Sequence, residues 1–228
     1  MQVEKILEVC CADIASVCAA ATAGASRIEL CAVLGEGGVT PSAGMMLVAR
    51  NVFKNTINVL IRVREGDFVY SDEEKAAMLL DIDTVASTGC NGAVVGALTS
   101  EGDIDIEFAS KAVARAHSHG LSITFHRAFD HCKNRVEALE QLISLGYDRV
   151  LTSAGADNVV EGIDGLKQLV ELASGRIIIL PGGGVNADNA ATVIETTSAT
   201  EIHGSCRAGS SYSDSDTIRT IINRINHV

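Results

Sequence analysis

Carboxylate, imidazole and guanidinium side chains recur at the ends of short apolar segments along this chain. They are Glu8, Glu29, Arg62, His126, Arg127, Asp130 and His203. Carboxylates and imidazoles are common general acids and bases, and a guanidinium stabilises negative charge that develops on a substrate. The set is typical of a catalytic site for a small molecule, with Glu29 or His126 as the base and Arg62 as the charge-stabilising group.

A second group of residues is typical of an anion site. The run Pro181-Gly182-Gly183-Gly184-Val185 follows one apolar segment, and Ser205 and Arg207 follow the last one. Glycine lets backbone N–H groups approach a ligand closely, and a helix N-terminus after the run favours an anion. We expect the anion-binding residues to be Gly182, Gly183, Gly184, Ser205 and Arg207. An equally weighted alternative is that the glycines bind no ligand and only allow a tight turn at a corner of the fold.

Eight short β-branched segments alternate with amphipathic helical segments, and these elements must position the residues above. The predicted strands are residues 6–10, 27–30, 57–63, 92–95, 122–126, 149–152, 177–180 and 201–203. Their starts are spaced roughly as a strand, a crossover helix and two loops require. The sequence therefore predicts eight consecutive strand–helix units.

Capping residues mark the starts of the intervening helices. Asp13 and Asp105 each precede an apolar stripe with helical spacing. Ser71 and Glu74 have the spacing of a capping box. Thr40, with proline directly after it, predicts a further N-cap with proline in the first helical position.

The repeated units predict one closed (β/α)8 barrel, a TIM barrel, as a single domain over residues 1–228. An open doubly wound sheet would need a glycine-rich nucleotide-binding turn after the first strand, and Cys10-Cys11-Ala12-Asp13 is no such turn. In a TIM barrel the carboxyl ends of the strands form the functional face. The candidate residues should therefore meet at one end of the barrel.

Strand periodicity predicts which side chains enter the barrel. Glu8, Glu29 and Glu201 each share a face with the residue two positions later, and we expect that face to point into the lumen near the barrel mouth. Buried carboxylates are costly unless they are paired, and Arg62 and His126 are the expected partners. The alternative is a structural ion-pair layer inside the barrel.

The amino-acid composition limits the classes of partner and the cellular compartment. The 228 residues include 18 Lys and Arg against 29 Asp and Glu, which gives a net charge of −11. This balance argues against nucleic acid and anionic membranes as partners, since both attract clustered cations. Seven scattered cysteines without zinc-type spacing predict a reducing compartment, and we expect the cytoplasm. The sequence is compatible with a monomer and with a homo-oligomer.

Sequence blocks along the whole chain resemble the CutC copper homeostasis family. They include Leu7-Glu8-Val9-Cys10, Arg27-Ile28-Glu29-Leu30-Cys31, Thr124-Phe125-His126-Arg127-Ala128-Phe129-Asp130, Pro181-Gly182-Gly183-Gly184-Val185 and Glu201-Ile202-His203. The resemblance implies a cytoplasmic barrel that handles copper, with Cys10 and Cys31 as Cu(I) ligands. Such a role suits the residue type, because Cu(I) is a soft ion that accepts thiolates.

Two functions remain as hypotheses. The first is copper homeostasis, in which the protein binds copper as Cu(I) and acts as a buffer or carrier. The second is an enzyme that acts on a small anionic or phosphorylated metabolite at the mouth of the barrel. The first leaves the charged strand ends unexplained, and the second names no substrate.

Overall fold

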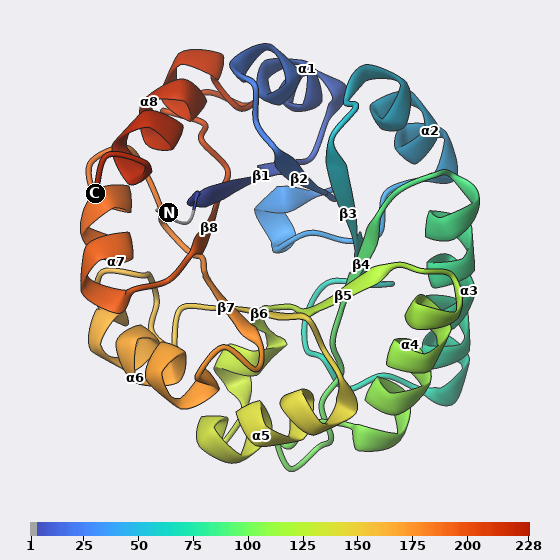
Figure 1. The fold of residues 1–228 in the computed structure, drawn as a ribbon. Coiled ribbons are helices and arrows are strands. Elements are labelled where there is room, and N and C mark those ends of the chain that lie inside the picture. The colour runs from blue at the N-terminus through green and yellow to red at the C-terminus, as the bar shows by residue number, and fades with distance from the viewer. Residues whose placement is uncertain (1–3) are drawn as a thin grey trace.

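The structure is a computed structural model and describes residues 4–228. Over this range eight strands form the inner barrel, and eight α-helices surround it (Figure 1). The strands are β1 (Ile6–Cys11), β2 (Arg27–Leu30), β3 (Thr56–Ile61), β4 (Gly92–Val95), β5 (Ser122–Phe125), β6 (Arg149–Thr152), β7 (Ile178–Pro181) and β8 (Glu201–Gly204). The α-helices are α1 (Ile14–Ala23), α2 (Ala43–Val52), α3 (Asp72–Ser87), α4 (Ile106–Ser118), α5 (Arg135–Leu145), α6 (Ile163–Ala173), α7 (Ala190–Thr197) and α8 (Ser215–Ile225). Two short 3-10 helices are η1 (Leu34–Glu36) and η2 (Arg127–His131).

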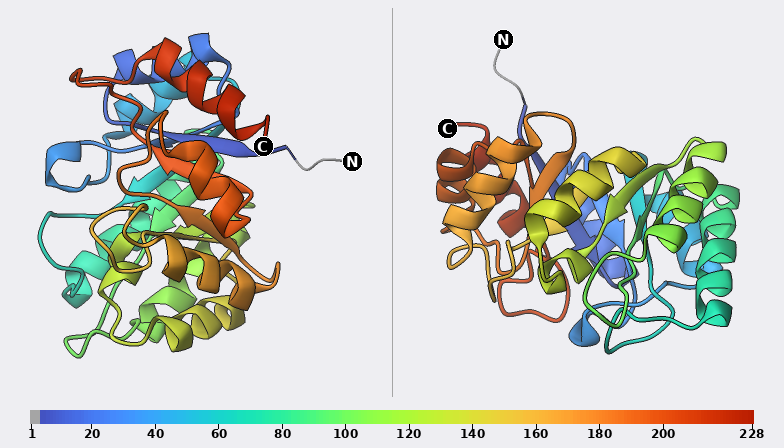
Figure 2. Two further views of the ribbon diagram at one scale, coloured as in Figure 1. Left: turned by 90° about the vertical axis from the view of Figure 1, so that its left-hand side faces the viewer. Right: turned by 90° about the horizontal axis from the view of Figure 1, so that it is seen from below.

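The strands pair in parallel in the order β7-β6-β5-β4-β3-β2-β1-β8. A parallel bridge between Gly182 and His203 brings the end of β7 beside β8. The predicted (β/α)8 barrel is therefore confirmed. Figure 2 shows the β2–α2 and β3–α3 loops extending at the end of the barrel opposite the C-terminus.

The two faces of the strands separate as their alternation predicts. Val9 and Ile28 belong to the large apolar core that the outer helices cover. Cys10, Cys31 and Leu60 belong to a separate small apolar cluster with Val94. A strand exchanges faces at every residue, so this separation puts Cys10 and Cys31 on the lumen side.

Most predicted helix starts are confirmed. The Asp13 and Asp105 side chains each accept a backbone N–H of the first helical turn. Ser71 and Glu74 exchange both bonds of the capping box. The cap at Thr40 is wrong: α2 begins after Ser42, whose side chain caps it.

Two strands end earlier than predicted. β3 ends at Ile61, so Arg62 begins the following loop, and β5 ends at Phe125, so His126 precedes η2. The side chain of His126 accepts the N–H of Ala128 and acts as the cap of η2. Both residues therefore belong to the loops of the barrel mouth rather than to the strands. No helix within residues 4–228 has the length and hydropathy that a membrane span requires.

Candidate functional site

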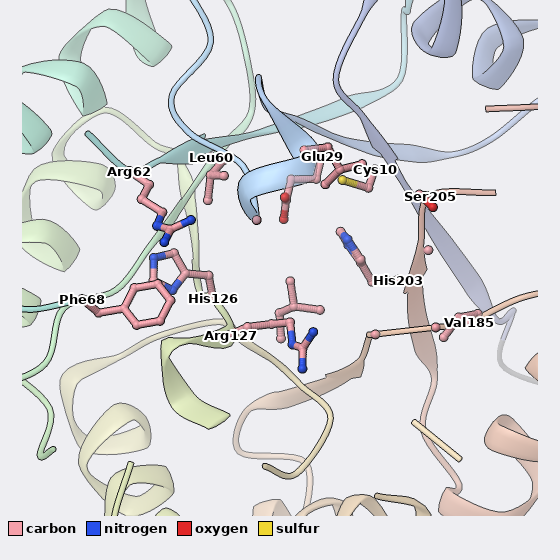
Figure 3. Close-up of a pocket in the computed structure, with 16 residues that line it drawn as sticks. Cys10, Glu29, Leu60, Arg62, Phe68, His126, Arg127, Val185, His203 and Ser205 are labelled. Carbon is pink, nitrogen blue, oxygen red and sulfur yellow. The ribbon is translucent and has the colours of Figure 1, made fainter. Parts of the chain in front are cut away.

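A pocket of about 340 Å³ lies at the carboxyl ends of the strands (Figure 3). Its polar lining is Cys10, Glu29, Arg62, His126, Arg127, His203 and Ser205, beside Gly183 and Gly184. Its apolar lining includes Leu34, Leu60, Phe68, Leu151 and Val185. The remaining candidates, Glu8, Cys31, Asp130, Gly182 and Arg207, are not among the residues that line it. The barrel thus brings most of the candidate residues to one pocket.

Cys10 and Cys31 form a buried thiol pair at one wall of the pocket. Their Sγ atoms lie 3.8 Å apart. Cys10 is the last lumen-facing residue of β1, and Cys31 directly follows the neighbouring strand β2. The contact with Cys31, followed by burial, raises the pKa of Cys10 well above its ordinary value. In the metal-free protein the Cys10 thiol is therefore protonated, and metal binding there would release a proton.

Glu29 and His203 lie near Cys10 (Figure 3). One ligand atom each from Cys10, Glu29 and His203 lies within 4.8 Å of the others. Glu29 is 4% exposed, and its Oε2 has no hydrogen-bond partner among residues 4–228. Burial raises the pKa of Glu29 to about 7, although His203 opposes the shift. A buried carboxylate without a partner is costly, so a cation in this pocket would stabilise it.

Glu8 lies outside the pocket lining and orients His203 by a hydrogen bond. Nδ1 of His203 lies 2.9 Å from Glu8 Oε1, which leaves Nε2 for the pocket. Glu8 Oε2 accepts from Arg27 Nε at 2.7 Å and from Asn58 Nδ2 at 2.9 Å. Burial opposes ionisation of Glu8, but Arg27, His203 and Asn58 lower its pKa to about 2. Burial likewise opposes protonation of His203, but Glu29 and Glu8 together raise its pKa above the ordinary value.

A buried ion-pair layer extends from Glu8 toward the amino-terminal ends of the strands. Arg27 Nη2 also donates to Glu201, and Arg149 Nε donates to Glu201 Oε2 at 2.9 Å. Glu201 begins β8 and so lies at the end of the strand away from the mouth, contrary to the prediction. The predicted alternative, an ion-pair layer, is thus confirmed for Glu8 and Glu201.

Arg62 and His126 are not the partners of the buried carboxylates, so that prediction is wrong. The guanidinium of Arg62 donates instead to the backbone carbonyls of Glu36, Gly38 and Gly66. It does so because Arg62 lies beyond the end of β3, where the β2–α2 and β3–α3 loops surround it. Arg27, which is not among the predicted residues, is the partner of Glu8 and Glu201. Arg27 and Glu29 are two residues apart and so share the lumen-facing side of β2, which is the signal in the sequence that identifies Arg27.

Arg62, His126 and Phe68 form the wall of the pocket across from Cys10 (Figure 3). The Phe68 ring centroid lies 4.9 Å from Arg62 Cζ and 5.0 Å from the His126 ring centroid. Arg62 Nε and His126 Nε2 are buried and lack a hydrogen-bond partner within the described part of the chain. Two unpaired donors on one wall suit an oxygen atom of a ligand.

His126 is neutral in this environment. Its Nδ1 accepts the N–H of Ala128, so the ring proton sits on Nε2. Burial, together with the charge of Arg62, lowers the pKa of His126 to about 3. A neutral imidazole N–H can polarise a ligand oxygen but is a poor general base, and this favours Glu29 for that role.

Arg127 is fixed at the rim beside the glycine run. Its Nε donates to Asp130 Oδ2 at 2.8 Å, and its Nη2 donates to Ser153 Oγ at 2.9 Å. Gly183 has a φ of 110°, and a Cβ there would lie 3.2 Å from Arg127 Nη1. Asp130 therefore positions Arg127, and Arg127 rather than Arg207 is the cation beside this part of the pocket.

Comparisons with known proteins agree with one another. The model of the CutC family matches residues 5–208. A CutC family protein of Vibrio campbellii is 47% identical over 197 residues, which are 86% of this chain and 80% of the relative. One from Agrobacterium fabrum is 46% identical over 207 residues, 91% of this chain and 81% of the relative. The crystal structure of CutC from Streptococcus agalactiae, named provisionally as a copper homeostasis protein, has a TM-score of 0.83 and 33% identity; the match covers 88% of this chain and 98% of that one.

Proposed function

The chain belongs to the CutC family, and we propose that it serves copper homeostasis by binding Cu(I) through Cys10 and Cys31. The observation that carries the proposal is the 3.8 Å separation of two buried Sγ atoms beside an open pocket. Thiolates are the soft ligands that select Cu(I). The name of the relative from Streptococcus agalactiae, a copper homeostasis protein, supports copper as the metal.

The surroundings of the thiols suit an ion that is taken up and released. The pocket gives the ion a path from solvent to Cys10, while burial of both thiols limits their contact with oxidants. The two sulfurs must stay reduced to bind, and the described structure contains seven free cysteines and no disulfide among residues 4–228. We therefore assign the protein to the cytoplasm as a copper buffer or carrier.

An anaerobic Cu(I) competition titration against a chromogenic chelator tests this function. Wild type should bind one Cu(I) per chain, and Cys10→Ser/Cys31→Ser should lose that binding. Cys18→Ser, which removes an exposed thiol outside the pocket, is the matched control and should bind as wild type does. If the double variant keeps the wild-type affinity, the proposed copper site is wrong.

A second candidate function is an enzyme for a small anionic or phosphorylated metabolite. The specific observation in its favour is the fixed guanidinium of Arg127, which Asp130 and Ser153 hold beside Gly183. The unpaired Nε of Arg62 and Nε2 of His126 supply further donors on the same pocket. Glu29 would act as the general base, and these donors would stabilise negative charge on the substrate.

Calorimetric titration with inorganic phosphate and with small carboxylates tests the second candidate. Wild type should bind one of these probes, and Arg127→Gln should weaken binding by at least tenfold. Arg219→Gln, an exposed arginine of α8, is the control. Equal affinities for wild type and Arg127→Gln would contradict the anion site.

A further inference from the structure

We propose that Glu29 and His203 join Cys10 and Cys31 in a four-ligand site for a borderline divalent cation, of which Zn²⁺ is the best fit. The inference shares the two thiols with the proposed copper site. It goes beyond that function in two respects, the ligand set and the class of ion.

The spacing of the two sulfur atoms fits tetrahedral coordination. Zinc binds sulfur at about 2.3 Å and imidazole nitrogen at about 2.0–2.1 Å, so two sulfurs of one tetrahedral site lie about 3.8 Å apart. The Sγ atoms of Cys10 and Cys31 are 3.8 Å apart. The ligand atoms of Cys10, Glu29 and His203 lie within 4.8 Å of one another. Cys31 is next to this group through its contact with Cys10.

The hydrogen bond between His203 and Glu8 is the arrangement that metal-binding histidines use. Such a histidine donates its second ring N–H to a carboxylate, which fixes the tautomer and the orientation of the ring. Nδ1 of His203 lies 2.9 Å from Glu8 Oε1, so Nε2 is the atom left for a metal. Arg27 and Asn58 in turn fix Glu8. The ring is therefore oriented before any ion arrives.

The carboxylate of Glu29 supplies the independent observation that points to a cation. It is 96% buried, faces the pocket, and has an Oε2 without a partner in the described chain. Neither nearby arginine bonds to it: Arg27 is bonded to Glu8 and Glu201, and Arg62 donates to backbone carbonyls. A bound cation would supply positive charge to this carboxylate in addition to that of His203.

The mixed donor set decides the class of ion. Two thiolates alone satisfy Cu(I), whereas a carboxylate oxygen is a hard ligand that a soft monovalent ion does not need. Zn²⁺ accepts sulfur, imidazole nitrogen and carboxylate oxygen in one tetrahedral site. Two thiolates, one imidazole and one carboxylate therefore match Zn²⁺ in number and in type.

The test uses the reduced, metal-free full chain under anaerobic conditions. Co²⁺ serves as the spectroscopic probe, because tetrahedral coordination with thiolates gives intense visible bands, and Zn²⁺ affinity follows from competition with a chromogenic chelator. Wild type should bind one Co²⁺ with tetrahedral bands and exchange it for Zn²⁺. Glu29→Gln should weaken Zn²⁺ binding by at least tenfold and leave Cu(I) affinity within about threefold. Glu36→Gln, an exposed glutamate near the rim, should change neither.

Separate outcomes test the two proposals. Wild-type Zn²⁺ affinity in Glu29→Gln, or Zn²⁺ binding that survives in Cys10→Ser/Cys31→Ser, overturns the four-ligand site. Cu(I) binding that is indifferent to the two cysteines contradicts the proposed copper function, while a Glu29-dependent Zn²⁺ site would still stand. His203→Asn removes a second ligand and should also weaken Zn²⁺, so the inference stays testable if Glu29→Gln folds poorly. Circular dichroism checks the fold of each variant.

Discussion

The 2.9 Å contact between His203 Nδ1 and Glu8 Oε1 joins the buried ion-pair layer of the barrel to its pocket. Glu8 belongs to the layer through Arg27, and His203 lines the pocket beside Cys10. A substitution in the ion-pair layer should therefore affect His203 in the pocket, even though Glu8 itself is outside the pocket lining. The ion-pair layer, the pocket and the residues around them lead to four predictions.

Loss of the Glu8 carboxylate should destabilise the barrel strongly. Glu8→Gln leaves Arg27 buried with less compensating charge, and we expect the free energy of unfolding to fall by about 3 kcal/mol. Urea denaturation at neutral pH measures it. Glu107→Gln breaks the exposed pair with Lys111 and should cost less than about 1 kcal/mol. Equal costs for the two variants would show that the buried layer contributes no more than a surface pair.

Glu29 should give the metal-free protein a characteristic pH dependence. Its pKa is about 7 in the folded chain against an ordinary value of 4.5, so the folded state binds the proton more tightly. The contribution of Glu29 to stability is therefore complete below about pH 4.5 and is lost as the pH rises through about 7.

Glu29→Gln should remove this dependence. Relative to wild type, the variant should gain little unfolding free energy near pH 4.5 and about 2–3 kcal/mol near pH 8. Urea denaturation of both proteins across this range, with chelator present, provides the measurement. A gain that is the same at both ends of the range would refute the raised pKa.

Gly92 should be intolerant of a side chain. A Cβ at this position would lie 2.4 Å from Asn58 Oδ1 and 3.0 Å from the backbone oxygen of Ser122. Gly92→Ala should displace Asn58 from Glu8 and lower the free energy of unfolding by about 1–3 kcal/mol. Gly35→Ala is the control, because nothing lies within 4 Å of its Cβ. Thermal unfolding of the two variants decides, and equal midpoints would contradict this packing.

The thiols should differ sharply in reactivity. Cys18 is exposed, and the other six cysteines are buried. Titration of the native protein with a disulfide reagent should therefore modify one thiol per chain rapidly, and Cys18→Ser should abolish that fast phase. In denaturant all seven thiols should react together. A fast phase that persists in Cys18→Ser would mean that Cys10 or another buried thiol is open to solvent.

The sequence by itself determined the parts of this protein that depend on local periodicity. Alternation along β1 and β2 put Glu8, Cys10, Glu29 and Cys31 on the lumen face, because successive strand residues point to opposite sides. Capping residues such as Ser71 marked helix starts, because their side chains bond within one turn. Repetition of such units was enough to predict the barrel.

Only the tertiary structure decided which residues pair. Parallel register puts Arg27 opposite Glu8 and Cys10 opposite Glu29, and no local pattern contains that register. Arg62 was assigned to the wrong partner because loops from two different units supply its carbonyl acceptors. The pKa values of Glu29 and His126 likewise follow from burial and from neighbours distant in sequence. Residue type and spacing identified the candidates, whereas strand register and loop packing decided their partners.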